Sequence, residues 1–171
     1  MGRAILVKTL HSIDRFTQVC GRGLAWLLYA MMLITCAVVT LRYGFSIGSI
    51  ALQESVIYLH GLVFMLGAAY ALQRDAHVRV DIFYRNFSPR RKALVNLLGT
   101  LVFLLPVCVF IIYVSWNYVD SAWSIRETSV ESQGIAAVFL LKTLIPLMAV
   151  LLLVQAVAEI IRNALRLSVQ D

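Results

Sequence analysis

The chain has 171 residues, of which 61% are hydrophobic and 14% are charged, and its formal net charge is +6. A soluble domain is typically about 45–50% apolar and about 25% charged, and a chain of this length is too short to bury the excess in its own core. The composition therefore excludes a water-soluble globule and also a disordered chain, because disordered segments are polar and rich in charge.

Four long segments are free of charged residues, with one exception, and each is long enough to cross a membrane as a helix. About 20 apolar residues span a hydrocarbon core of about 30 Å at a rise of about 1.5 Å per residue. Membrane strands would show segments of about 10 residues with alternating polarity, a pattern that these runs lack. The sequence thus predicts an all-α membrane protein with one domain over residues 1–171. Its four transmembrane helices are expected at residues 23–42, 54–73, 92–118 and 135–159.

The N-terminal segment before the first span is polar and mixed in charge. Its apolar residues recur at roughly helical spacing, opposite Lys8, Ser12 and Arg15. This pattern predicts a short interfacial helix that leads into the first span. No small-residue cleavage site follows the apolar run cleanly, so we do not expect a cleaved signal peptide.

Two charged residues flank the short connection between the first and second spans. Arg42 closes the first span and Glu54 opens the second, so both are expected at the same membrane surface. The two side chains can pair with each other, although an exposed ion pair contributes only about 0–1 kcal/mol. Contact with a partner protein is the alternative role for both residues.

The loop after the second span is the densest polar segment of the chain. From Arg74 to Asp81, charged residues of both signs alternate with small apolar residues, and bulky apolar residues follow. A loop that met only water would not need these apolar residues. We therefore expect a short interfacial helix that docks on lipid headgroups or on another protein, with His77, Arg79 and Asp81 setting its register. Catalysis by His77 and Asp81 is the alternative, but the sequence offers them neither a nucleophile nor a pocket.

The third span begins and bends at recognisable residues. Ser88 followed by Pro89 is typical of an N-cap and the first helical position. Pro106 cannot donate a hydrogen bond to the carbonyl of Val102, which predicts a kink in this span.

Lys142 is the one charged residue at depth in the predicted spans. A charge that faces lipid there costs at least about 2.5–3.5 kcal/mol, unless the side chain snorkels to the surface. Pro146 cannot donate to the carbonyl of Lys142, so the alternative is a polar pocket filled by a lipid phosphate or another subunit. No acid of this chain lies at that depth, and we therefore expect any ionic partner of Lys142 to come from outside the chain.

The distribution of Lys and Arg predicts the orientation. Twelve of these residues lie in the N-terminal segment, the second loop and the C-terminal tail, whereas the first and third loops hold two. By the positive-inside rule, both termini and the second loop are cytoplasmic. Topology accounts for the positive charge, and no nucleic-acid partner is indicated.

The sequence shows no pattern that is typical of an enzyme or a cofactor site. The three cysteines lack the spacing of disulfides or metal ligands. His60 is the one histidine within a span and lies near its outer end, which argues against paired haem ligation. No carboxylate lies deep in a span, as a proton-coupled carrier would require.

The stretch LRYGFSIGSIALQESVIYLHGLVFMLGAAYALQRDAHVRVDIFYRNFSPR resembles the small membrane subunit of tripartite ATP-independent periplasmic (TRAP) transporters, the DctQ family. The similarity runs from about Leu28 to Leu165, and its most specific part is the HVRVD motif. The matching points are Arg42-Tyr43, Glu54, Leu66 to Tyr70, Arg74, His77 to Asp81, Trp123 to Glu127, and Leu141 to Leu147.

The resemblance implies a non-catalytic subunit that braces a large membrane subunit while an elevator domain of that subunit moves. The large, M-type subunit would hold the substrate and sodium sites, and a periplasmic binding protein would deliver an organic acid. This chain would then lie in the inner membrane of a bacterium or archaeon, without a cofactor. Contacts with these partners or with membrane phospholipid are expected at Arg42, Glu54, Arg74, His77, Arg79, Asp81 and Lys142.

Two other functions stay open at this stage. The chain can be the membrane anchor of a redox enzyme, although the depth of the histidines argues against it. It can also be a small autonomous transporter, although the missing intramembrane acid argues against that function.

Overall fold

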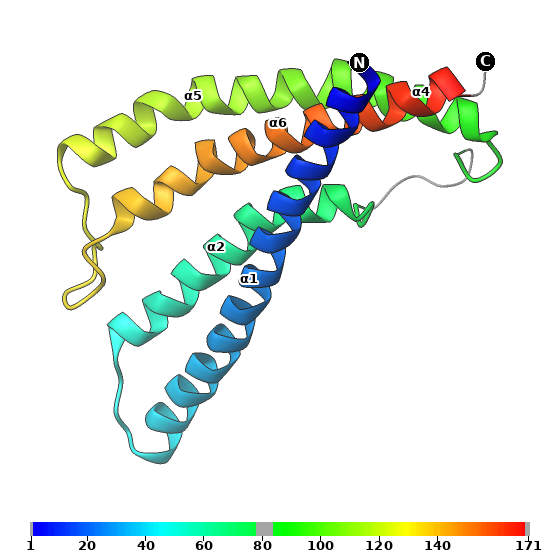
Figure 1. Ribbon diagram of the computed structural model, residues 1–171. Coiled ribbons are helices and arrows are strands. Elements are labelled where there is room, and N and C mark those ends of the chain that lie inside the picture. The colour runs from blue at the N-terminus through cyan, green and yellow to red at the C-terminus, as the bar shows by residue number, and fades with distance from the viewer. Residues whose placement is uncertain (1, 78–83, 170–171) are drawn as a thin grey trace.

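The structure is a computed structural model that describes residues 2–77 and 84–169, and this part of the chain consists of helices and loops without strands. Four helical segments are long and apolar enough to cross a membrane, which confirms the predicted all-α membrane fold with four spans (Figure 1). They are α1 (Gly2–Gly44), α2 (Ile50–Gln73), the continuous path of α4 (Pro89–Gly99), η1 (Thr100–Leu104) and α5 (Leu105–Ser124), and α6 (Val138–Val169).

The first span differs from the prediction because the N-terminal segment is not a separate short helix. It is helical, but it continues into the span as one helix, α1, of 43 residues. At about 1.5 Å per residue α1 is about 65 Å long, roughly twice the thickness of a hydrocarbon core. The interfacial helix predicted in the second loop falls largely on residues 78–83, which lie outside the described residues.

The helix starts follow the expected capping chemistry. Ser88 caps α4 by accepting a hydrogen bond from the backbone N–H of Arg91, and Pro89 occupies the first turn, as predicted. Ser49 caps α2 in the same way, through the N–H of Leu52. In both cases the hydroxyl satisfies a backbone donor that has no partner inside the helix.

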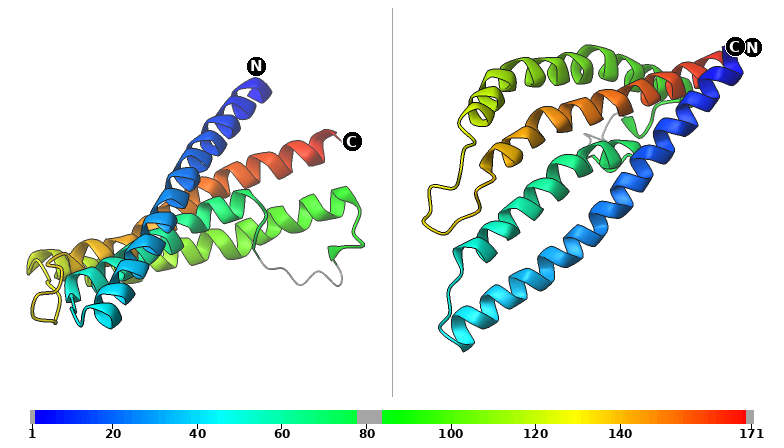
Figure 2. Two further views of the ribbon diagram at one scale, coloured as in Figure 1. Left: turned by 90° about the horizontal axis from the view of Figure 1, so that it is seen from below. Right: turned by 60° about the vertical axis from the view of Figure 1, so that its left-hand side comes forward.

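The third span contains a π-helical turn, η1, directly before Pro106. The N–H of Leu105 donates to the carbonyl of Thr100, one residue further back than in an α-helix. Such a widened turn accommodates the missing donor of the proline. Figure 2 shows the path from α4 through α5 as an arch, in agreement with the predicted kink.

The spans pack with α6 at the centre, because α6 contacts α1, α2, α4, η1 and α5. Both termini lie at one end of the molecule, which we call the termini end (Figure 1). The connections 45–49 and 125–137 lie at the opposite end, the loop end. Small side chains dominate the buried apolar positions and allow close helix packing. They are Ala69, Ala93, Ala122, Ala149, Ala156 and Ala158, together with Cys108.

Gly21 brings α1 against α2. A Cβ atom at this position would overlap the ring of Tyr70, whereas Gly23, on the same helix, has no atom within 4 Å of such a Cβ. The close approach therefore depends on the absence of a side chain at Gly21.

Gly21→Ala is expected to destabilise the chain, although alanine favours helix more than glycine does. Forcing a methyl group into a filled space costs about 1–3 kcal/mol, which outweighs the gain of at most about 1 kcal/mol in helix propensity. Gly23→Ala meets no neighbour and should be neutral or stabilising. Thermal unfolding of the two purified variants in the same detergent tests this, and equal midpoints would contradict it.

Candidate functional site

The polar side chains of the spans form two groups, one near each end of the molecule. At the termini end, Arg162 of α6 holds Asp14 of α1 through one guanidinium nitrogen, Nη2, which lies 2.7 Å from Oδ1 and 2.8 Å from Oδ2. Its other terminal nitrogen, Nη1, donates to Glu159 one turn earlier on α6. The guanidinium is thus shared by two carboxylates and links the first and fourth spans.

A buried hydrogen-bond pair reinforces this link. Gln155 is fully buried, and its Oε1 accepts a hydrogen bond of 2.9 Å from Thr17 Oγ1. Gln73, at the end of α2, donates to the backbone oxygen of Asp14 at 2.7 Å. Buried polar groups that satisfy one another fix helix positions strongly, since each is costly to leave without a partner. Three helices, α1, α2 and α6, meet at this point.

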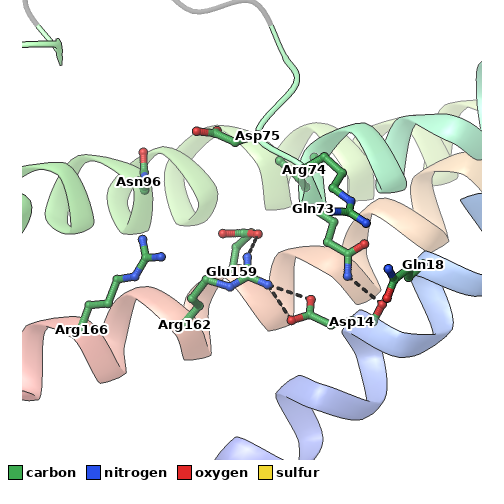
Figure 3. A pocket seen from close by; sticks show the side chains of 10 residues that line it. Asp14, Gln18, Gln73, Arg74, Asp75, Asn96, Glu159, Arg162 and Arg166 are labelled. Atoms are coloured by element: carbon green, nitrogen blue, oxygen red, sulfur yellow. Dashed lines mark hydrogen bonds and ion pairs between the residues drawn. The ribbon is translucent and has the colours of Figure 1, made fainter.

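A pocket of about 430 Å³ opens beside this network (Figure 3). Arg74, at the end of α2, lies on its rim with the guanidinium carbon 5.4 Å from the centroid of the Tyr70 ring. Arg166 reaches in from α6, and in Figure 3 its guanidinium points towards Asn96 of α4. The remaining lining residues are Asp14, Gln18, Leu72, Gln73, Asp75, Glu159 and Arg162.

At the loop end, the carboxylate of Glu54 anchors the loop that joins α5 to α6. One oxygen accepts from Ser129 Oγ, and the other accepts from the backbone N–H of Ile135 at 2.5 Å. Gly134 packs so closely that a Cβ atom there would overlap Ser129. Glu54 therefore does not pair with Arg42, which is exposed and makes no ion pair within the described ranges.

Lys142 has an ionic partner within this chain, so the expectation of an external partner is wrong. Its Nζ lies 2.5 Å from Glu127 Oε2 and 4.1 Å from the centroid of the Tyr118 ring. Only 17% of the Lys142 side chain and 30% of the Glu127 side chain is exposed. The loop after α5 turns back at Arg126, whose φ is 48°, and brings Glu127 to the depth of Lys142.

Aromatic residues surround this ion pair. Trp123 Nε1 donates to Thr143 Oγ1 at 2.8 Å, and the Trp123 ring meets Phe139 edge-on with 4.8 Å between centroids. The guanidinium of Arg126 lies over both rings, at 5.9 Å and 5.7 Å. The end of α5 is thus fastened to the start of α6 by one ion pair and an aromatic cluster.

The structure does not bring the seven predicted contact residues together. Glu54 and Lys142 have partners near the loop end, Arg74 lies in the pocket near the termini end, and His77 is exposed in the following loop. Arg79 and Asp81 lie outside the described residues, so neither the register nor the catalytic interpretation of this loop is tested. Within the described ranges no group of three or more metal-binding side chains forms.

Sequence reasoning missed the polar network of the termini end. Asp14, Gln155 and Arg162 are separated by up to 148 residues, and they meet only because α1 crosses α6. One available signal is Gln155 itself, an amide in an otherwise apolar run, which requires a partner when it is buried.

Comparison with known proteins identifies the family of this chain and a curated relative. Residues 31–166 match the family described as tripartite ATP-independent periplasmic transporters, DctQ component. Over 95 residues the chain is 27% identical to the C4-dicarboxylate TRAP transporter small permease protein DctQ of Vibrio cholerae serotype O1. This similarity covers 56% of the chain and 40% of the relative, so the matched region spans less than half of the relative's length. No solved structure matches.

Proposed function

The chain belongs to the DctQ component family of TRAP transporters, and from this premise we propose that it is the small membrane subunit that braces a large membrane subunit. In this role the chain is non-enzymatic and needs no cofactor. The large subunit carries the substrate and sodium sites, and a soluble binding protein delivers the substrate outside the inner membrane. The substrate class is an organic acid, in keeping with the dicarboxylate named for the relative from Vibrio cholerae.

The observation that supports a bracing role most is how the polar groups of the spans are used. Asp14, Arg162 and Gln155 tie α1 to α6 at one end, and Gln73 adds α2. At the other end, Glu127 and Lys142 tie the loop after α5 to α6. A carrier uses intramembrane polar groups to bind and release its cargo. Here the same kinds of groups bind one another, which favours a rigid scaffold.

A second observation is the apolar outer surface. Large side chains on α1, η1 and α5 are exposed, among them Trp26, Phe103, Phe110 and Tyr113. Such a surface suits contact with lipid and with the apolar helices of a second membrane protein. Through this surface the chain can associate with a second membrane protein while the packing among its own helices stays unchanged.

Co-purification tests this proposal. A tagged chain extracted gently from its native membrane should carry with it a larger multi-span membrane protein, and both should be required for sodium-dependent uptake of an organic acid. Liposomes containing this chain alone should show no uptake. Uptake by the chain alone, or haem absorbance in the purified protein, would overturn the proposal in favour of an autonomous transporter or a redox anchor.

A further inference from the structure

Two arginines of the termini-end pocket differ from the third in their partners. Arg162 is held by Asp14 and Glu159, as described above. Arg74 contacts the face of Tyr70, its Nη2 lies 3.1 Å from the side-chain amide of Gln18, and it forms no ion pair with a described carboxylate. Arg166 makes no hydrogen bond or ion pair in the part of the chain that the structure covers. The rim of the pocket thus presents two guanidinium groups that no carboxylate of the described residues neutralises, and only one donor of Arg74 is engaged, by the Gln18 amide.

The pocket lies where the apolar runs of the spans give way to polar residues. The uncharged run of α2 ends at Gln73, and Arg74 follows it directly. Lys92 is the last charged residue before the apolar run that contains Asn96, and Glu159 is the first charged residue after the apolar run of α6. Three helices therefore pass from apolar to polar at the pocket. This is the level at which a bilayer places its phosphate groups.

We propose that this pocket binds the phosphate group of a membrane phospholipid, with Arg74 and Arg166 donating to its oxygens. The planar guanidinium fork matches the spacing of phosphate oxygens and gives charge-assisted hydrogen bonds. The two arginines come from α2 and α6, so one phosphate bound between them joins the ends of both helices. Arg162 stays with its two carboxylates and closes the floor of the pocket.

The volume and the location of the pocket favour the phosphate of a lipid headgroup over other anions. A space of about 430 Å³ admits a phosphate with its glycerol and headgroup substituents, and the acyl chains would lie outside the pocket, along the apolar runs of the helices that end there. Inorganic phosphate and the carboxylate of another subunit offer similar oxygen donors. They differ from a phospholipid in needing no adjoining apolar surface, and the experiment separates them.

Native mass spectrometry of the purified full chain, titrated with phosphatidylglycerol, tests the site. A basic residue near a membrane surface contributes about 1 kcal/mol towards an anionic lipid, which corresponds to about fivefold in affinity. Arg166→Gln and Arg74→Gln should each weaken binding about fivefold, and the double variant by more than tenfold. Arg91→Gln is the matched control, because Arg91 is exposed on α4 and does not line the pocket.

Two further measurements distinguish a phospholipid from free phosphate as the ligand. Diacylglycerol, which lacks the phosphate, should not bind in a manner that depends on Arg166, and inorganic phosphate should not displace phosphatidylglycerol. Thermal midpoints should show that all variants fold, since neither Arg74 nor Arg166 forms an ion pair among the described residues. Equal losses in Arg91→Gln and Arg166→Gln would overturn the site, as would binding of inorganic phosphate with the same arginine dependence. Neither outcome bears on the transport role, because the assay uses the chain without its partners.

Discussion

Arg162→Gln is expected to lower the thermal midpoint of the purified chain by several degrees, one of the two largest effects that we predict. The substitution leaves the carboxylate of Asp14 without its ionic partner between α1 and α6. Breaking a fully buried ion pair costs about 3–5 kcal/mol. The side chains here retain 21% and 29% exposure, which reduces the expected loss to about 1–3 kcal/mol.

A second substitution distinguishes this explanation from a general loss of packing. Asp14→Asn combined with Arg162→Gln also removes the Asp14 carboxylate, so only Glu159 is left without its partner, and part of the stability should be recovered. Arg91→Gln, at an exposed position, should have almost no effect. If the double variant is less stable than Arg162→Gln alone, the ion pair is not the source of the effect.

The second large effect is expected for Glu127→Gln. This substitution should lower the stability of the chain towards unfolding more than Lys142→Leu does. Without Glu127, the Lys142 ammonium remains on a membrane span with 17% of its side chain exposed. A charge at the centre of a span costs about 2.5–3.5 kcal/mol, and partial access to the surface reduces this to about 1–3 kcal/mol. Lys142→Leu instead leaves Glu127 on a loop, where the carboxylate can turn to water at a cost below about 1 kcal/mol.

Unfolding of the two variants in nanodiscs, followed by tryptophan fluorescence, measures this asymmetry. Trp123 lies next to the ion pair and reports on the joint between α5 and α6. The double variant Glu127→Gln/Lys142→Leu should be more stable than Glu127→Gln alone. Equal destabilisation by the two single changes would mean that Lys142 is no deeper than its partner.

The spans were predictable because each depends on a local property, the length of a segment without charge. The same is true of the start of α4, where Ser88 and Pro89 act within one turn of the helix. The N-terminal segment, expected to form a short helix that leads into the first span, is instead the first part of the long helix α1, because nothing there ends a helix. Glycine in a helix interior lowers helix stability by about 1 kcal/mol relative to alanine. The packing of α1 on α2 and α6 stabilises the helix by more than this loss.

The pairing of charges was not predictable because it depends on where chain segments meet. The prediction of an external partner for Lys142 was wrong because no acid lies within the spans at its depth, and its partner Glu127 lies on a loop. Glu127 reaches Lys142 because α5 continues to Ser124 and the following loop folds back. Asp14 and Arg162 meet through the crossing of α1 and α6, and no feature of either segment alone specifies that crossing.

The two hairpins, α1 with α2 and α5 with α6, are joined at both membrane faces. Asp14 and Arg162 connect them at the termini end, and Glu54 connects α2 to the loop before α6 at the loop end. Two helical hairpins that are connected at one end only can rotate about that connection. Two hairpins that are connected at both ends resist sliding along each other. The hairpins can therefore tilt together but cannot slide past each other without breaking an ionic contact. If the chain is the proposed small subunit, movement across the membrane would then have to come from the partner subunit and not from sliding of these hairpins.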